Sequence, residues 1–192
     1  MKTIFIVAGF KHSAHEEQYE WMKRYFESLG FTVKTPNIRW NNRTMTDYTH
    51  QFINYYNKYK SEVNYILGFS FGAMISLITA DKLKPDSLYL CSLSPYFKED
   101  LPTIKKSWRR SIGKKRIEDF ESYSGITLAK RISMPTVVFY GTQEAGKYPQ
   151  LKVRCTETKN LNSNCRLIIA QNAPHEIDYP TYIEAIKSSF TD

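Results

Sequence analysis

The sequence has few cysteines and lacks the spacings that would give them a structural use. Cys91, Cys155 and Cys165 are the three thiols, an odd number, and no two of them form a C-x-x-C pair. Such usage argues against a disulfide framework and against a zinc site. It is typical of a reducing compartment, so we expect a cytoplasmic protein that binds no metal.

Long hydrophobic runs are also missing. The apolar stretch at residues 3–10 ends at Lys11, whereas a membrane span needs about 18 apolar residues. No small-residue cleavage site of the kind found in signal peptides follows this stretch. We therefore expect no membrane span and no secretion signal.

Charge is plentiful, but the motifs of nucleic-acid-binding proteins are not. The net charge is +8, and seven basic residues surround Trp108 within residues 104–116. Basic clusters that contain an aromatic residue can bind phosphate backbones. Because no helix-turn-helix, zinc or RNA-binding signature accompanies the cluster, we interpret it as a solvated helix face and keep a nucleic-acid partner as the weaker alternative.

Hydrophobic content is sufficient for one core. The chain has 192 residues, of which 42% are hydrophobic, a size typical of one domain over residues 1–192. Longer segments with helical periodicity separate six short, β-prone runs at residues 3–7, 31–34, 63–67, 87–91, 136–140 and 166–170. This alternation predicts a three-layer α/β/α domain around a mainly parallel six-stranded sheet.

Three of the helices have recognisable termini. Ser13 and Glu16 form a capping-box pattern and Gly30 is a stop signal, which predicts a helix between them. An apolar stripe predicts a second helix over residues 44–60. Pro180 suits the first turn of a last helix.

Residues 92–135 are too many for a single crossover between the fourth and fifth strands. Their pattern predicts two helices, residues 99–112 and 114–131, separated by Gly113. We expect residues 97–133 to be an insertion that forms a small helical lid over the carboxyl ends of the strands.

The pentapeptide Gly68-Phe69-Ser70-Phe71-Gly72 has the pattern G-x-S-x-G between a predicted strand and an apolar helix at residues 73–80. A serine on such a strand-turn-helix junction is held in a strained conformation with its hydroxyl exposed, and the small flanking residues let strand and helix approach. We expect Ser70 to be a nucleophile.

A serine nucleophile needs a base and a group that orients this base. His175 follows the sixth strand and is the predicted base, because ligands of an open α/β sheet bind at the carboxyl ends of the strands. Glu144 follows the fifth strand and is the predicted acid. The acidic pair Glu99 and Asp100, after the fourth strand, remains the alternative.

Backbone amides must stabilise the oxyanion. The Phe71 amide at the start of the helix is one predicted donor, and the Phe10 amide after the first strand is the other. Aromatic residues near these positions are candidates for an apolar substrate pocket, although the same residues could belong to the core: Phe69, Tyr96, Phe97 and Trp108.

The nucleophile motif, the order Ser70, Glu144, His175 and the glycine after the first strand resemble the α/β-hydrolase superfamily over almost the whole chain. The resemblance implies a serine hydrolase that works through an acyl-enzyme without a metal or organic cofactor. The sequence departs from the common pattern in three respects: it lacks the usual N-terminal hairpin, has Ala8 where many members have histidine, and has glutamate in place of the commoner aspartate.

These features predict an esterase or thioesterase that acts on a small or medium acyl substrate. The sequence does not separate ester, thioester and amide substrates, or a hydrolase from an acyltransferase. The alternatives are a non-catalytic binding module with this fold and a nucleic-acid-associated protein that uses the basic lid.

Overall fold

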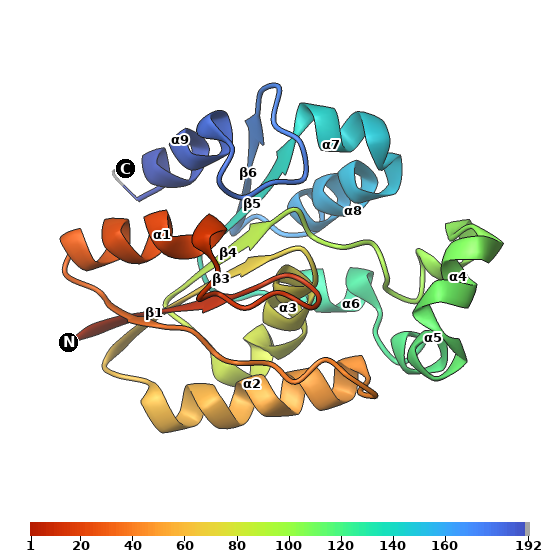
Figure 1. The fold of residues 1–192 in the computed structure, drawn as a ribbon, viewed down its shortest axis with the longest axis horizontal. Helices are drawn as coiled ribbons and strands as arrows, with labels where there is room; N and C mark the ends of the chain where they lie inside the picture. Colours follow the sequence, from red (N-terminus) through yellow and green to blue (C-terminus); the bar gives the residue numbers. More distant parts are fainter. Residues whose placement is uncertain (191–192) are drawn as a thin grey trace.

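The computed structural model describes residues 1–190, and Figure 1 shows a sheet with helices on both faces. Six strands pair in parallel in the order β2-β1-β3-β4-β5-β6. The predicted parallel sheet is confirmed, and every predicted strand lies within two residues of the observed bounds. The strands are β1 (Lys2–Val7), β2 (Thr32–Lys34), β3 (Val63–Phe69), β4 (Ser87–Cys91), β5 (Thr136–Gly141) and β6 (Cys165–Ala170).

The two faces of the sheet have separate hydrophobic cores, as the alternation of side chains along a strand requires. In β1, Ile4 and Ile6 face α1 (Glu17–Ser28) and α9 (Pro180–Ser188). Phe5 and Val7 face the other way, toward a layer that contains α2 (Met45–Tyr59), α3 (Phe71–Leu83) and α8 (Pro149–Asn160). These two helix layers enclose the sheet, which confirms the three-layer architecture (Figure 1).

The helix termini follow their sequence signals with one correction. Thr44 caps α2 with a complete capping box, in which its side chain accepts from the Asp47 amide and the Asp47 side chain accepts from the Thr44 amide. Gly30 ends the α1 region with a φ of +77°. At the start of α1 only half of the predicted capping box is present: the Ser13 amide donates to Glu16 Oε1 at 2.8 Å, but the Ser13 hydroxyl accepts from His15. The helix therefore begins at Glu17, after the turn that these two bonds hold.

The segment between β4 and β5 is more broken than predicted. It forms a short 3-10 turn (Leu101–Thr103), α4 (Lys106–Ile112), α5 (Lys114–Phe120) and α6 (Gly125–Lys130). The predicted helix over residues 99–112 is wrong at its start, because Pro102 falls in the 3-10 turn and α4 begins later. The predicted helix over residues 114–131 is interrupted at residues 121–124, where the Ser124 hydroxyl accepts from the Thr127 amide and caps a new helix.

Of these short helices, α4 and α5 lie at one end of the molecule, whereas α6 lies beside α3 (Figure 1). None of the side chains of α4 is buried, whereas α5 buries Ile117 and Phe120. Within the described residues, no helix has the length and apolar character that crossing a membrane requires. The chain returns to β5 through α6, and α7 (Thr142–Lys147) follows β5 directly.

Candidate active site

Ser70 lies alone between the end of β3 and the start of α3. Its backbone has φ 57° and ψ −116°, a conformation that residues with a side chain rarely adopt. The Ser70 amide donates to the Cys91 carbonyl at 2.8 Å, which holds the turn against the neighbouring strand. The turn therefore has the strained geometry expected from the G-x-S-x-G pattern.

The two glycines of this pattern are required by space. A Cβ on Gly72 would lie 1.9 Å from the Val7 carbonyl oxygen, and one on Gly68 would lie 2.3 Å from the Gly72 carbonyl oxygen. Both obstacles are backbone atoms, which cannot turn aside as a flexible side chain would. The close approach of β1, β3 and α3 thus explains why glycine occupies both positions.

Three predicted residues from three separate segments meet at the carboxyl ends of the strands. Ser70 Oγ lies 3.1 Å from His175 Nε2, and His175 Nδ1 lies 2.7 Å from Glu144 Oε2. Ser70 follows β3, Glu144 follows β5 and His175 follows β6. An imidazole that donates through Nδ1 to the carboxylate has Nε2 free to accept from the serine hydroxyl.

The Glu144 side chain has no exposed surface and is held by several donors. Its Oε1 accepts from the Gly141 amide at 2.6 Å and from the Ser92 hydroxyl at 2.8 Å. The Ser92 hydroxyl lies 2.7 Å from the Tyr182 hydroxyl. Burial, followed by the proximity of Cys91 and Glu144, raises the pKa of Tyr182 well above its ordinary value, so this phenol stays a neutral donor.

Two polar residues near Ser70 are not indicated by any sequence pattern. Ser92 is fully buried with a φ of +53°, and the only sequence signal for it is its position directly after β4. Ser94 is also buried, and its hydroxyl lies 3.2 Å from Ser70 Oγ. A serine in a loop has no periodic pattern that would have singled out either residue.

The His175 ring is supported by two aromatic residues. Its centroid lies 4.9 Å from that of Phe69, with the planes inclined by 34°, and Tyr148 approaches its edge at 6.0 Å. Phe69 is a predicted pocket residue, and its ring lies against the imidazole. This contact limits the tilt of the imidazole between Ser70 and Glu144.

The two predicted oxyanion donors belong to segments next to Ser70: Phe71 follows it in the chain, and a Cβ on Gly9, which precedes Phe10, would lie 3.5 Å from Ser70 Cβ. Phe71 is the first residue of α3, Phe10 follows β1, and their ring centroids are 5.0 Å apart. Within residues 1–190, neither backbone amide donates a hydrogen bond to another part of the chain. The loop that carries Phe10 is held in place because the Gly9 amide donates to the Tyr19 hydroxyl at 3.1 Å.

The alternative acids are engaged elsewhere. Asp100 is buried and binds Arg154 through two hydrogen bonds, of 2.6 and 3.1 Å. Glu99 accepts from the Ser124 hydroxyl and from the Gly125 amide. Glu99 therefore joins two parts of residues 97–133, and Asp100 fixes this segment to α8. Neither carboxylate contacts His175 within the described residues.

The other predicted pocket residues occupy different environments. Tyr96 packs against Phe71 with a centroid distance of 5.2 Å, and its hydroxyl lies 2.7 Å from the indole Nε1 of Trp108. Trp108 is 52% exposed. Phe97 is fully buried beneath the Arg154 guanidinium, which lies 5.5 Å from its ring centroid.

A metal site of the usual kind is not assembled in the part of the chain that the structure describes. Across residues 1–190, no three histidine, cysteine, aspartate or glutamate side chains gather in a group that could hold an ion.

Comparison with solved structures places this geometry in a known fold. The chain matches no protein-family model, and no curated protein sequence matches it. Mouse alpha/beta hydrolase domain-containing protein 10 superposes with a TM-score of 0.81 at 11% identity, over 99% of this chain and 88% of that one. Est1E from Butyrivibrio proteoclasticus, determined with bound ferulic acid, gives 0.79 at 13% identity, over 100% and 88%. An esterase from Pyrococcus furiosus gives 0.69 at 18% identity, over 99% and 80%. The chain has the α/β-hydrolase fold.

Proposed function

We propose that the protein is a serine hydrolase that cleaves a small or medium acyl ester or thioester through an acyl-enzyme on Ser70. One observation carries the proposal: Ser70 Oγ, the His175 imidazole and the buried Glu144 carboxylate form a continuous series of hydrogen bonds of 3.1 and 2.7 Å. This is the arrangement that activates a serine hydroxyl at neutral pH.

In the proposed reaction, Ser70 Oγ attacks the acyl carbonyl carbon while His175 Nε2 takes the hydroxyl proton. Glu144 stabilises the imidazolium that forms, and the amides of Phe71 and Phe10 donate to the oxyanion. His175 then gives its proton to the leaving group. A water molecule, deprotonated by His175, then attacks the acyl-enzyme. The bond between the acyl carbon and Ser70 Oγ breaks, His175 returns the proton to Oγ, and the acid is released.

Two further observations support this assignment. Structurally similar proteins include an esterase and a lipase-esterase related protein, which favours a hydrolase over a binding module. The rings of Phe10, Phe71 and Tyr96 pack in series beside Ser70 and offer an apolar wall for an acyl group.

Residues 97–133 are proposed to be the lid of this site within a single domain, because Trp108 and Phe120 reach that wall through Tyr96 and Phe71.

Labelling with a fluorophosphonate probe tests the proposal directly, because the probe phosphonylates only an activated serine. The wild-type protein should be labelled, and mass spectrometry should place the adduct on Ser70. Ser70→Ala should not be labelled. Ser94→Ala should still be labelled, since Ser94 lies 3.2 Å from Ser70 Oγ but makes no contact with His175 within residues 1–190. A folded wild-type protein that stays unlabelled would contradict the proposal and favour a binding module.

A further inference from the structure

The positive charge of the protein is concentrated in one short segment. Residues 105–116, here called the basic segment, contain seven lysines and arginines and no acidic residue. Without these seven, the chain has 20 basic and 19 acidic residues. The net charge of +8 is therefore almost entirely a property of this segment, which forms α4 and the start of α5.

The structure leaves most of these charges uncompensated. Within residues 1–190, Lys106, Arg109 and Arg110 form no ion pair, and Lys114 reaches Glu118 only across 3.6 Å on the exposed surface. Like charges held this close repel one another, so the segment produces a strong local positive potential. A bound anion would relieve that repulsion.

A shallow cavity of about 440 Å³, largely open to solvent, lies within the basic segment and its continuation in α5. Four of its five lining residues are cationic and none is acidic: Lys106, Arg109, Arg110, Lys114 and Ile117. Guanidinium groups bind carboxylate and phosphate oxygens in pairs. The lining of this cavity thus suits an anion of either type.

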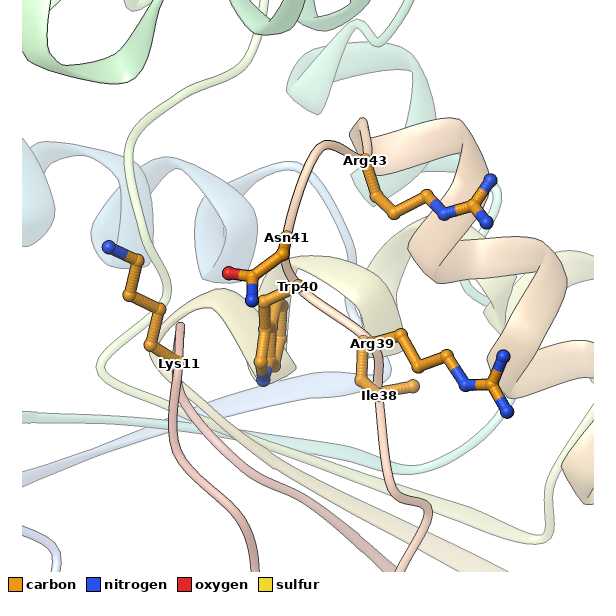
Figure 2. A pocket seen from close by; sticks show the side chains of 6 residues that line it. All are labelled: Lys11, Ile38, Arg39, Trp40, Asn41 and Arg43. Atoms are coloured by element: carbon orange, nitrogen blue, oxygen red, sulfur yellow. The ribbon is translucent and has the colours of Figure 1, made fainter.

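A second basic cavity, of about 620 Å³, lies between the Phe10 loop and the residues before α2. Figure 2 shows Lys11 on one side of Trp40 and Asn41, with the guanidinium groups of Arg39 and Arg43 directed to the other side. These cations do not converge on one point. They extend the positive surface and leave the first cavity as the better candidate for a binding site.

Short chains of contacts connect the first cavity with the candidate nucleophile. Trp108, next to Arg109, donates to the Tyr96 hydroxyl at 2.7 Å, and the Tyr96 ring lies 5.2 Å from that of Phe71. Phe71 directly follows Ser70. The helix that carries most of the cavity lining is therefore linked through Trp108 to the aromatic wall of the candidate active site.

We infer that the substrate carries a carboxylate or phosphate group that binds the cavity lined by Lys106, Arg109, Arg110 and Lys114 while its acyl bond lies at Ser70. The inference rests on the proposed function and adds the class of substrate to it. Contacts remote from the reacting bond are made equally in the ground state and the transition state, so the charge of the substrate should act on KM more than on kcat.

The anion could belong to the acyl group or to the leaving group, and two pairs of substrates separate these sources. The 4-nitrophenyl monoester of glutaric acid, compared with 4-nitrophenyl valerate, adds a carboxylate to the acyl group. Acetyl coenzyme A, compared with acetyl N-acetylcysteamine, adds phosphates to the leaving group. In one pair or both, the anionic member should have a kcat/KM at least about tenfold higher at low ionic strength, and salt should reduce this preference.

Charge reversal locates the effect. The double substitution Arg109→Glu and Arg110→Glu should raise KM for the preferred anionic substrate about tenfold. It should leave KM for the neutral substrate of the same pair unchanged. Because α4 buries no side chain, this variant should keep its fold. Lys23→Glu with Arg24→Glu is the matched control, since both residues are exposed on α1, on the opposite face of the sheet, and it should behave like the wild type.

A binding measurement keeps the test independent of catalysis. Tripolyphosphate titrated into Ser70→Ala should bind, and binding should weaken about tenfold when Arg109 and Arg110 are reversed but not when Lys23 and Arg24 are. Equal kcat/KM values within both substrate pairs, or binding insensitive to the reversal at Arg109 and Arg110, would overturn the inference.

The two proposals fail in distinguishable ways. Hydrolysis of neutral esters by Ser70 without any preference for charge would leave the proposed function intact and remove the anionic substrate. Tripolyphosphate binding without labelling or ester hydrolysis would support the anion site and overturn the hydrolase. Oligonucleotide binding that is lost on reversal, with no preference between the esters, would replace the inference with a nucleic-acid partner.

Discussion

The Ser92 hydroxyl donates to Oε1 of Glu144 at 2.8 Å, deep in the protein. This contact and the Gly141 amide occupy one carboxylate oxygen, so that Oε2 is the oxygen that meets His175. A buried carboxylate must have its lone pairs satisfied. The donors that satisfy Glu144 therefore also decide which way it points.

Ser92→Ala should lower kcat about tenfold with little change in KM, because a partner that orients a catalytic group, and does not touch the substrate, acts on the rate. The variant should also lose about 1–3 kcal/mol of stability, the usual cost of removing a donor from a buried acceptor. Tyr182→Phe keeps the Ser92 donor and should have the smaller effect on kcat. Steady-state kinetics and thermal denaturation measure both effects, and an unchanged kcat in Ser92→Ala would reduce Ser92 to a structural residue.

Glu144→Gln and Asp100→Asn should affect different properties. We expect Glu144→Gln to lower kcat/KM by about 10³-fold or more, since an amide at this position no longer holds the imidazole in its working tautomer. Asp100→Asn should retain most of the activity but lose about 3 kcal/mol of stability, because it leaves Arg154 buried with less compensation. The reverse pattern in activity would transfer the role of the acid to Asp100.

Gly72→Ala should destabilise the protein by about 3 kcal/mol or more, because its Cβ would lie 1.9 Å from the Val7 carbonyl oxygen and packed backbone relaxes poorly. Gly146→Ala is the matched control. Apart from its chain neighbours and the backbone of α7 itself, no described atom lies within 4 Å of a Cβ at Gly146, so this change should be neutral or stabilise by about 0.5–1 kcal/mol. Chemical denaturation compares the two variants, and equal stabilities would refute the close approach of α3 to β1.

Alkaline pH should destabilise the fold. Burial raises the pKa of Cys165 to about 11 and raises the pKa of Cys91 and of Cys155 well above the ordinary value of a thiol. It also raises the pKa of Tyr56 and of Tyr89 to about 12. These groups ionise more readily in the unfolded chain, so their contribution is complete below about pH 8.5 and is lost as the pH rises toward 12.

Urea denaturation at a series of pH values measures this loss, and a thiol reagent provides a second readout. At pH 8 the native protein should react with 5,5′-dithiobis(2-nitrobenzoic acid) far more slowly than the urea-unfolded chain, because all three thiols are buried and un-ionised. Rapid reaction of the native protein would show that one of the thiols is accessible. Constant stability from pH 8 to 11 would contradict the raised pKa values.

Local patterns were sufficient for the strands, for the turn that carries Ser70 and for the strand ends at which the candidate residues lie. Each parallel strand is a short buried run, and the loops after β3, β5 and β6 must emerge at one edge of the sheet. The order of Ser70, Glu144 and His175 in the chain could therefore be converted into proximity. The helices between β4 and β5 were predicted too long, because the turns at Pro102 and Ser124 are favoured by contacts and caps that periodicity does not register.

The sequence by itself determined that Ser70 would lie on a strained turn, since the glycines that allow this turn are its near neighbours in the chain. Only the tertiary structure decided which carboxylate would face His175. Glu144 and Asp100 are both buried after strand ends, but Arg154 on α8 neutralises Asp100, whereas Ser92 and Gly141 direct Glu144 to the imidazole. Ser92 and Arg154 lie more than fifty residues from the carboxylates that they bind, so packing in three dimensions selects between the two acids.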